Sequence, residues 1–237
     1  MAGDRMTLQQ VAEYLRVEPI QVSRLVRQGE IPFSGATDKP LFDQGEIDAW
    51  ASRRILGMSD KRLASYHTES ERPVKGGAES FSVCDMISAD RIVLDLPSKT
   101  KASVLADVTK IADDAGLLYD PHDLLESLKA REELCSTGLG NGVAIIHPRH
   151  HDPYLATESF LLLARAAHPV HFGAPDGKPT DLFFVLVCQD DRHHLQSLTH
   201  LCLMFTQTPV LAELRAAESA DDMLASLRAA EQAIERR

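Results

Sequence analysis

One segment of seventeen residues, 131–147, constrains the fold of this chain more than any other. Its sequence, REELCSTGLGNGVAIIH, is typical of a helix end, a glycine-rich loop and a short apolar strand that ends at a histidine. Residues 143–146 form the strand candidate, which would place His147 at the C-terminal edge of a sheet, where ligands of α/β folds bind. Glycines allow backbone conformations that side chains forbid, and they let N–H groups turn toward an anion. The glycines in question are Gly138, Gly140 and Gly142.

Length and composition limit the number of domains and the class of protein. The chain has 237 residues, enough for one large or two small domains, and its 44% hydrophobic and 25% charged residues are ordinary for a globular protein. No apolar run is long enough for a transmembrane helix and no signal peptide opens the sequence, so we expect a cytoplasmic protein without membrane contact. The four cysteines lack metal-ligand spacing, so we expect buried, reduced thiols and neither a metal nor a cofactor.

Charge divides the chain into two parts. Residues 1–62 carry nine basic and nine acidic side chains, whereas residues 63–237 carry sixteen basic and twenty-six acidic ones, which accounts for the whole net charge of −10. This asymmetry favours two units with different partners. The glycine pair at 76–77 is the clearest break. We therefore predict a first domain at 1–60, a linker at 61–80 and a second domain at 81–237.

The first domain has the pattern of a small helical module. Thr7 and Gln10 form a possible capping box ahead of a first helix at 8–15, and Pro19 suits the first turn of a second helix that Gly29 ends. An extended segment at 39–42 follows, and Asp43 is placed to cap a third helix. The string MTLQQVAEYLRVEPIQVSRLVRQGEIP…LFDQGEIDAW resembles the excisionase/MerR-like winged helix-turn-helix module over about 45 residues.

This resemblance implies that the second helix enters the major groove of DNA. Arg24 and Arg27 could contact guanine edges or phosphates, and Ser23 and Gln21 could bond to bases or backbone. The segment at 39–42 would form part of the wing of this module. It departs from the family pattern, since Pro40-Leu41 stands where family members often have arginine. A neutral module binds DNA weakly as a monomer, so a homodimer would help, and a role in protein contacts stays open as the alternative. The implied DNA-binding residues are Gln21, Ser23, Arg24, Arg27, Gln28 and Lys39.

The second domain alternates helix and strand patterns, which predicts an α/β unit with helices on both faces of a mixed sheet. The run at 182–188 is apolar at every position, so we expect a central strand there. The chain as a whole is predicted to be an α+β two-domain protein. Strands are expected at 92–94, 143–146, 160–165 and 182–188, and helices at 102–115, 120–133, 192–206, 209–217 and 220–233.

The glycine-rich segment resembles the active-site segment of the mannitol/fructose/nitrogen-regulatory type of EIIA domain, from the bacterial phosphotransferase system. The family pattern ARE…ST-G-G-G-A-I-P-H is matched over eighteen residues, except that Ile146 stands where the family usually has proline. The resemblance implies that His147 is phosphorylated by a histidine-phosphorylated phosphocarrier protein. The matching positions are Ala130, Arg131, Glu132, Ser136, Thr137, Gly138, Gly140, Gly142, Ala144, Ile145 and His147.

The resemblance also implies the other residues of the site. A second histidine follows the central strand in the family, and by register it is His194, at a helix N-terminus that would favour a phosphoryl group. Arg131 would neutralise phosphoryl charge, because a guanidinium suits phosphoryl oxygens. Thr137 and the three glycine N–H groups would orient His147 or bind the phosphoryl group.

Three functions follow. The first is a transcriptional or nitrogen/carbon regulator, in which phosphorylation of His147 tunes DNA or partner binding by the helix-turn-helix. The second is a phosphocarrier component whose helix-turn-helix is an interaction module. The third is an EIIA-like regulator that is never phosphorylated. No permease segment is present in this sequence, which favours regulation over transport.

Overall fold

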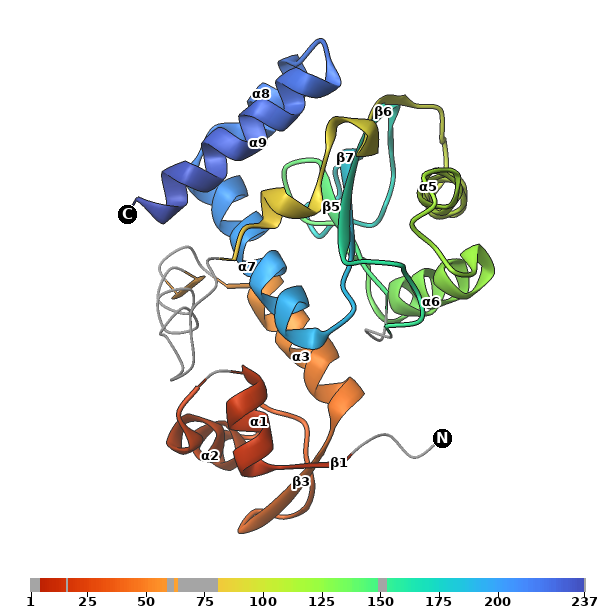
Figure 1. The fold of residues 1–237 in the computed structure, drawn as a ribbon. Helices are drawn as coiled ribbons and strands as arrows, with labels where there is room; N and C mark the ends of the chain where they lie inside the picture. The colour runs from red at the N-terminus through yellow and green to blue at the C-terminus, as the bar shows by residue number, and fades with distance from the viewer. Residues whose placement is uncertain (1–4, 16, 59–61, 64–80, 149–152, 237) are drawn as a thin grey trace. The chain divides into compact units, whose positions relative to one another are not determined.

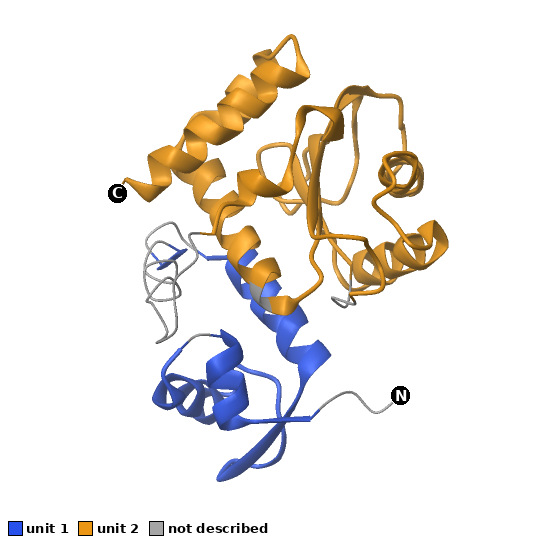
Figure 2. Ribbon diagram, in the orientation of Figure 1, with its two compact units in different colours: residues 1–80 blue, residues 81–237 orange. Residues whose placement is uncertain are grey.

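The computed structural model describes residues 5–15, 17–58, 62–63, 81–148 and 153–236. The chain divides into two compact units, residues 1–80 and 81–237 (Figure 2). Most of the predicted linker at 61–80 lies outside the described residues. Among those residues, no helix combines the length and apolar character needed to cross a membrane.

Unit 1 is a helical module with a three-stranded antiparallel sheet of order β1-β3-β2. The capping box is confirmed, since Thr7 N–H donates to Gln10 Oε1 at 2.8 Å and Gln10 N–H donates to Thr7 Oγ1 at 3.4 Å. Gly29 ends the second helix with φ 67°, a left-handed conformation that favours glycine, and Asp43 caps the third. Its elements are β1 Arg5–Thr7, α1 Leu8–Leu15, α2 Pro19–Gln28, β2 Ser34–Ala36, β3 Lys39–Asp43 and α3 Gln44–Leu56.

Unit 2 is built around a four-stranded mixed sheet of order β4-β6-β7-β5. The β4–β6 and β5–β7 pairs are parallel, while β6 and β7 are antiparallel. The expected central strand is confirmed as β7, which lies between β6 and β5. The elements are η1 Val83–Met86, η2 Ala89–Arg91, β4 Ile92–Leu96, α5 Lys101–Asp114, α6 Pro121–Leu134, β5 Val143–Ile146, β6 Phe160–Val170, β7 Thr180–Val187, α7 Asp191–Gln207, α8 Val210–Ala216 and α9 Ala220–Glu235.

Strand alternation distributes the apolar side chains over both faces of this sheet. One set, including Ala144, Ile146 and Val185, packs with α5 and α6 in a single buried cluster. The residues between them face the other way, where Phe184 meets Phe205 of α7 with ring centroids 4.8 Å apart. Helices therefore cover both faces, with α5 and α6 on one side and the C-terminal helices on the other (Figure 1).

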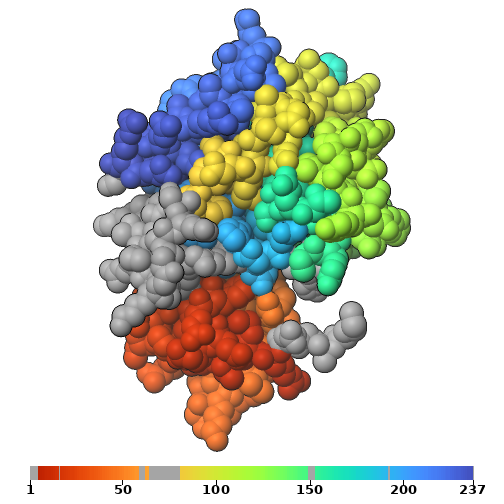
Figure 3. Space-filling model, in the orientation of Figure 1, coloured from red at the N-terminus to blue at the C-terminus, as the bar shows by residue number. Residues whose placement is uncertain are grey.

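The start of unit 2 packs against its end. Figure 3 shows the C-terminal helices, in blue, directly beside the first described residues of unit 2, in yellow. Glu231 of α9 joins them, because its carboxylate accepts hydrogen bonds from Ser82 Oγ at 2.7 Å, Val83 N–H at 2.6 Å and Cys84 N–H at 3.1 Å. Buried carboxylates need such partners, so this cluster fixes where the chain enters the domain.

Candidate functional site

His147 owes its position to the parallel pairing of β5 with β7. Ile146 pairs with Val185, and His147 follows directly at the C-terminal end of β5. The C-terminal end of β7 lies at the same edge and leads to Asp190, the N-cap of α7. His194, in the first turn of that helix, thereby meets His147, with ring centroids 5.0 Å apart and the planes tilted by 44°. Both residues are buried, at 1% and 0% exposure.

The hydrogen bonds of His147 define its tautomer. Nδ1 lies 2.9 Å from the carbonyl oxygen of Ile145, which can only accept a hydrogen bond, so Nδ1 carries the proton. Nε2 accepts a hydrogen bond from Nε of Arg131 at 3.0 Å. With a proton on Nδ1 and none on Nε2, the imidazole in this arrangement is neutral. Nε2 keeps its lone pair and is the nucleophilic atom.

Arg131 is buried in the last turn of α6, with 3% of its surface exposed. Its Nη1 donates to the carbonyl oxygen of Cys135 at 3.1 Å and contacts Sγ of the same residue at 3.4 Å. Its Nη2 is buried without a hydrogen-bond partner among the described residues. A buried guanidinium N–H that lacks a partner is costly, and an anionic oxygen is the group that would satisfy it.

Glu132 organises the segment between α6 and β5, a role that the sequence analysis missed. Its Oε2 accepts from Thr137 N–H at 2.8 Å and from Thr137 Oγ1 at 2.7 Å. Its Oε1 accepts from Lys101 Nζ at 2.6 Å, and that ammonium group also lies 5.0 Å from the ring centre of Phe172. Thr137 thus holds the backbone near His147, because Ile145 N–H donates to its carbonyl oxygen. The available signal was an acidic residue directly after Arg131.

The glycine-rich loop lies at the other end of β5 from His147. Residues 137–139 run antiparallel to β5, with Gly138 beside Ala144, so residues 139–142 form the turn that precedes the strand. A strand of four residues spans about 13 Å. Gly140 and Gly142 are therefore out of reach of a phosphoryl group on His147, and Gly138 lies between the two ends. Their placement does not support the phosphate-binding role expected for these glycines.

The structure gives two of these glycines a steric reason instead. Gly142 has φ 74°, and a Cβ there would lie 2.7 Å from Nη2 of Arg215 and 2.8 Å from Oδ1 of Asp181. At Gly138, a Cβ would meet the backbone nitrogen of Ala174 at 3.1 Å. Both positions are thus close approaches between segments far apart in the sequence, a common reason for glycine.

Ile146, which replaces the usual proline of the family pattern, is accommodated in the fold. It is the last residue of β5, and its side chain is buried in the cluster that packs against α5 and α6. The strand therefore continues to the residue directly before His147, and the histidine is still delivered to the sheet edge.

The other histidines of α7 have different surroundings. The side chain of His193 is about half exposed and bonds to Asp190, whereas His200 is buried with Nδ1 3.3 Å from Oε1 of Glu231. Burial alone would raise the pKa of Glu231, but hydrogen bonds from His200, Ser82 and Cys84 outweigh it and lower that pKa to about 2. In the described part of the chain, no group of three or more His, Cys, Asp or Glu residues is placed to hold a metal ion.

The expected DNA-binding residues of α2 fall on two sides of the helix. Val22 and Val26 are buried, Ser23 is half-buried and Arg27 is exposed. Gln21, Arg24 and Gln28 line a groove of about 620 Å³ whose other wall includes Trp50 of α3. Around the helix, Arg24 lies between the groove residues Gln21 and Gln28 and the exposed Arg27.

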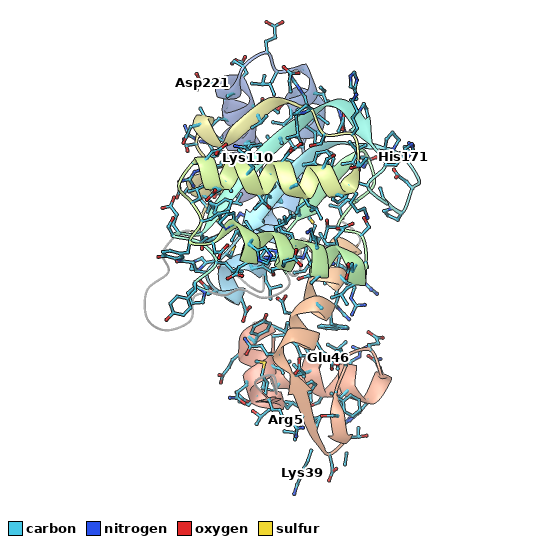
Figure 4. The ribbon with its side chains drawn as sticks, turned by 90° about the vertical axis from the view of Figure 1, so that its right-hand side faces the viewer. Arg5, Lys39, Glu46, Lys110, His171 and Asp221 are labelled. Carbon is cyan, nitrogen blue, oxygen red and sulfur yellow. The ribbon has the colours of Figure 1, made fainter. Side chains whose placement is uncertain are left out.

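The wing carries little charge. Lys39 is exposed on the β2–β3 hairpin and is labelled at its outer end in Figure 4. Arg5, on β1, is a further exposed cation that the sequence analysis did not consider, and its backbone lies opposite that of Asp43 in the antiparallel pairing of β1 with β3. Its strand has only three residues, too few to show a periodic pattern.

Comparisons with known proteins assign both units. Residues 85–230 match the family model "Phosphoenolpyruvate-dependent sugar phosphotransferase system, EIIA 2", and residues 5–55 match the model "Helix-turn-helix domain". The "Nitrogen regulatory protein" of Pseudomonas aeruginosa is 33% identical over 138 residues, which are 57% of this chain and 88% of that protein. The "PTS system fructose-specific EIIABC component" of Bacillus subtilis is 27% identical over 146 residues, 61% of this chain but only 22% of that protein.

A solved structure agrees with these matches. The crystal structure of nitrogen regulatory protein IIA-Ntr from Neisseria meningitidis superimposes with a TM-score of 0.55 at 34% identity, over 61% of this chain and 98% of that one. The EIIA match covers more than half of the 237 residues. The chain therefore belongs to the EIIA type 2 family of the phosphotransferase system, related to nitrogen regulatory proteins and fused to an N-terminal helix-turn-helix domain.

Proposed function

We propose that His147 accepts a phosphoryl group from a histidine-phosphorylated phosphocarrier protein. The observation that carries this proposal is the arrangement at Nε2 of His147, a lone pair held in a buried site by the guanidinium of Arg131. Nε2 attacks phosphorus in line, its new N–P bond forms as the N–P bond of the donor breaks, and the donor histidine leaves with the electron pair. The proton on Nδ1 stays in its hydrogen bond to Ile145.

Two side chains complete the chemistry. Arg131 exchanges its bond to Nε2 for bonds to phosphoryl oxygens, and its Nη2 gains the partner that it lacks among the described residues. His194 adjoins the acceptor ring, where an imidazole N–H can donate to a phosphoryl oxygen beside the N-terminus of α7. Burial of both histidines keeps competing water away from the N–P bond.

Labelled phosphoenolpyruvate and the general phosphotransferase proteins test this step. We expect a single label on Nε2 of His147, no label in His147→Ala, and slower labelling in His194→Ala. His171→Ala is the matched control, since His171 is exposed in the segment after β6, and it should label normally. Equal labelling of His147→Ala and the wild type would refute the proposal. The absence of any label would favour an EIIA-like regulator that is never phosphorylated.

We further propose that the helix-turn-helix domain binds duplex DNA, so that the chain is a regulator rather than a transport component. The names of its nitrogen regulatory relatives support regulation. DNA affinity should fall steeply with salt and be lost when Arg24 and Arg27 are both replaced by glutamate. Lys110→Glu with Arg228→Glu makes the same charge change on exposed sites of unit 2 and should leave binding intact. Equal loss in both double variants would mean that only net charge matters.

Regulation requires that the phosphoryl group change binding by the first domain. A phosphohistidine adds up to two negative charges to the site, and coupling between two sites is typically about 1–3 kcal/mol, which changes occupancy several-fold. The measurement is DNA affinity of phosphorylated and unphosphorylated protein at one salt concentration. Identical affinities and identical sedimentation in both states would favour a phosphocarrier component with a tethered interaction module.

A further inference from the structure

Ile20 is an apolar side chain that the fold leaves in water. It is the second residue of α2, and 73% of its surface is exposed. Among the described residues of unit 1 the other exposed large apolar side chain is Leu41, at 36%. A branched apolar side chain is stabilised by burial, and the domain leaves most of the Ile20 side chain exposed.

The helix places Ile20 in a definite stripe. Ile20, Arg24 and Arg27 are spaced i, i+4 and i+7, which puts them on one face, roughly opposite Val22 and Val26. The apolar side chain is the N-terminal member, and two exposed guanidinium groups follow it along the same face. In helix-turn-helix proteins, residues near the N-terminus of the second helix are the ones that reach base edges.

The chemistry of the stripe selects its partner. In the major groove thymine alone presents a methyl group, while guanine edges and phosphates accept hydrogen bonds from arginine. A second copy of the chain is a poorer partner, because two copies of this stripe facing each other would oppose like charges. Resting on the proposed DNA binding, we infer that Ile20 is a specificity-determining residue that reads the 5-methyl group of a thymine.

The test compares thymine with uracil, which lacks only this methyl group. The probe is the most enriched duplex that the full chain selects from a random library at low salt, with each thymine replaced in turn by deoxyuridine. We expect one or a few positions at which the replacement weakens wild-type binding roughly fourfold, the effect of one buried methyl-sized group. Ile20→Ala should bind the thymine duplex correspondingly less well and no longer distinguish the two bases. Ile20→Val should retain part of the preference, and Leu41→Ala, the matched control, should retain it fully.

The other possible results of this experiment lead to different conclusions. A thymine preference that survives in Ile20→Ala overturns the inference. DNA that is bound at low salt without any enriched sequence also overturns it, since no base is then read, yet leaves DNA binding in place. No DNA binding at all refutes the proposed function itself. Self-association that is lost in Ile20→Ala, with the base preference unchanged, would assign Ile20 to a protein contact instead.

Discussion

Replacing Glu231 by glutamine should destabilise unit 2 by an amount that the structure allows us to work out. The hydrogen bonds to its carboxylate lower its pKa from 4.5 to about 2, despite burial. At about 1.36 kcal/mol per pH unit, this depression corresponds to about 3 kcal/mol of folding free energy at neutral pH. Glu231→Gln removes the charge that His200, Ser82 and Cys84 surround, so it should forfeit most of that amount.

The sign of the pH dependence follows from the direction of the shift. A carboxyl group with a depressed pKa in the folded state stabilises the protein above its unfolded pKa, and this contribution is lost as pH falls from about 4.5 to about 2. The difference in the free energy of unfolding between the wild type and Glu231→Gln should therefore be largest at pH 7 and shrink as the pH falls through that range. The assay is urea unfolding of the full chain, followed by far-UV circular dichroism at several pH values. With a typical slope, the midpoint at pH 7 should fall by roughly 1–2 M urea.

A matched control and a refuting result complete the test. Glu218→Gln removes an exposed carboxylate of the same unit and should shift the midpoint little. The one tryptophan, Trp50, lies in unit 1, where Nε1 donates to the carbonyl oxygen of Glu30 at 2.5 Å, so its fluorescence follows that unit separately. If the gap between Glu231→Gln and the wild type were the same at pH 3 as at pH 7, the carboxylate would not be the source of the stability.

Three further predictions concern Arg131 in the site and two residues that shape the surrounding backbone, Glu132 and Gly142. Arg131→Gln should slow labelling of His147 by roughly 10²-fold, the scale for one pre-placed donor, with an unchanged circular dichroism spectrum; a rate near that of the wild type would contradict the role of the guanidinium. Glu132→Gln should lose its ion pair with Lys101 and cost about 1–3 kcal/mol in urea unfolding, an effect that Lys101→Met should reproduce in part. Gly142→Ala should destabilise unit 2 by about 1–3 kcal/mol, because its φ is 74°, yet leave the labelling rate per folded molecule unchanged; a slowed rate would return the loop to the site.

The sequence predicted those parts of the site that depend on local pattern. An apolar run of four residues leads directly to His147, and this pattern placed His147 at a strand end. The position of His194 beside it was implied only by the family resemblance, and the parallel pairing of β5 with β7 explains how the fold brings the two together. The environment of Glu132 was not predictable in this way, because Lys101 lies thirty-one positions earlier and nothing in the spacing connects them. The glycine turn was misjudged for a similar reason, since the group that excludes a side chain at Gly142 is Arg215 on α8.

The elements of the fold were predicted best where they are long and periodic. The helices of unit 2 agree with expectation to within about two residues at each end, which is the usual uncertainty of helix boundaries. β6 is longer than expected, reaching Val170, because its more exposed second half is held by the pairing of Val170 with Thr180 beyond an irregularity in the register. The face of α2 was not predictable, since the position of α3 decides which side of the helix borders a groove.

The pairing of β5 with β7 has a consequence for how such a domain tolerates change. His147 and the helix that carries His194 follow neighbouring parallel strands, so the main-chain hydrogen bonds between β5 and β7 bring the two residues to the same edge of the sheet. Substitutions on the outer faces of the helices leave these hydrogen bonds in place, so we expect them to have little effect on where the two histidines lie. The turn at 139–142 lies at the far end of β5 from the histidines, so a change there would strain the local packing around Gly142 before it reached the site.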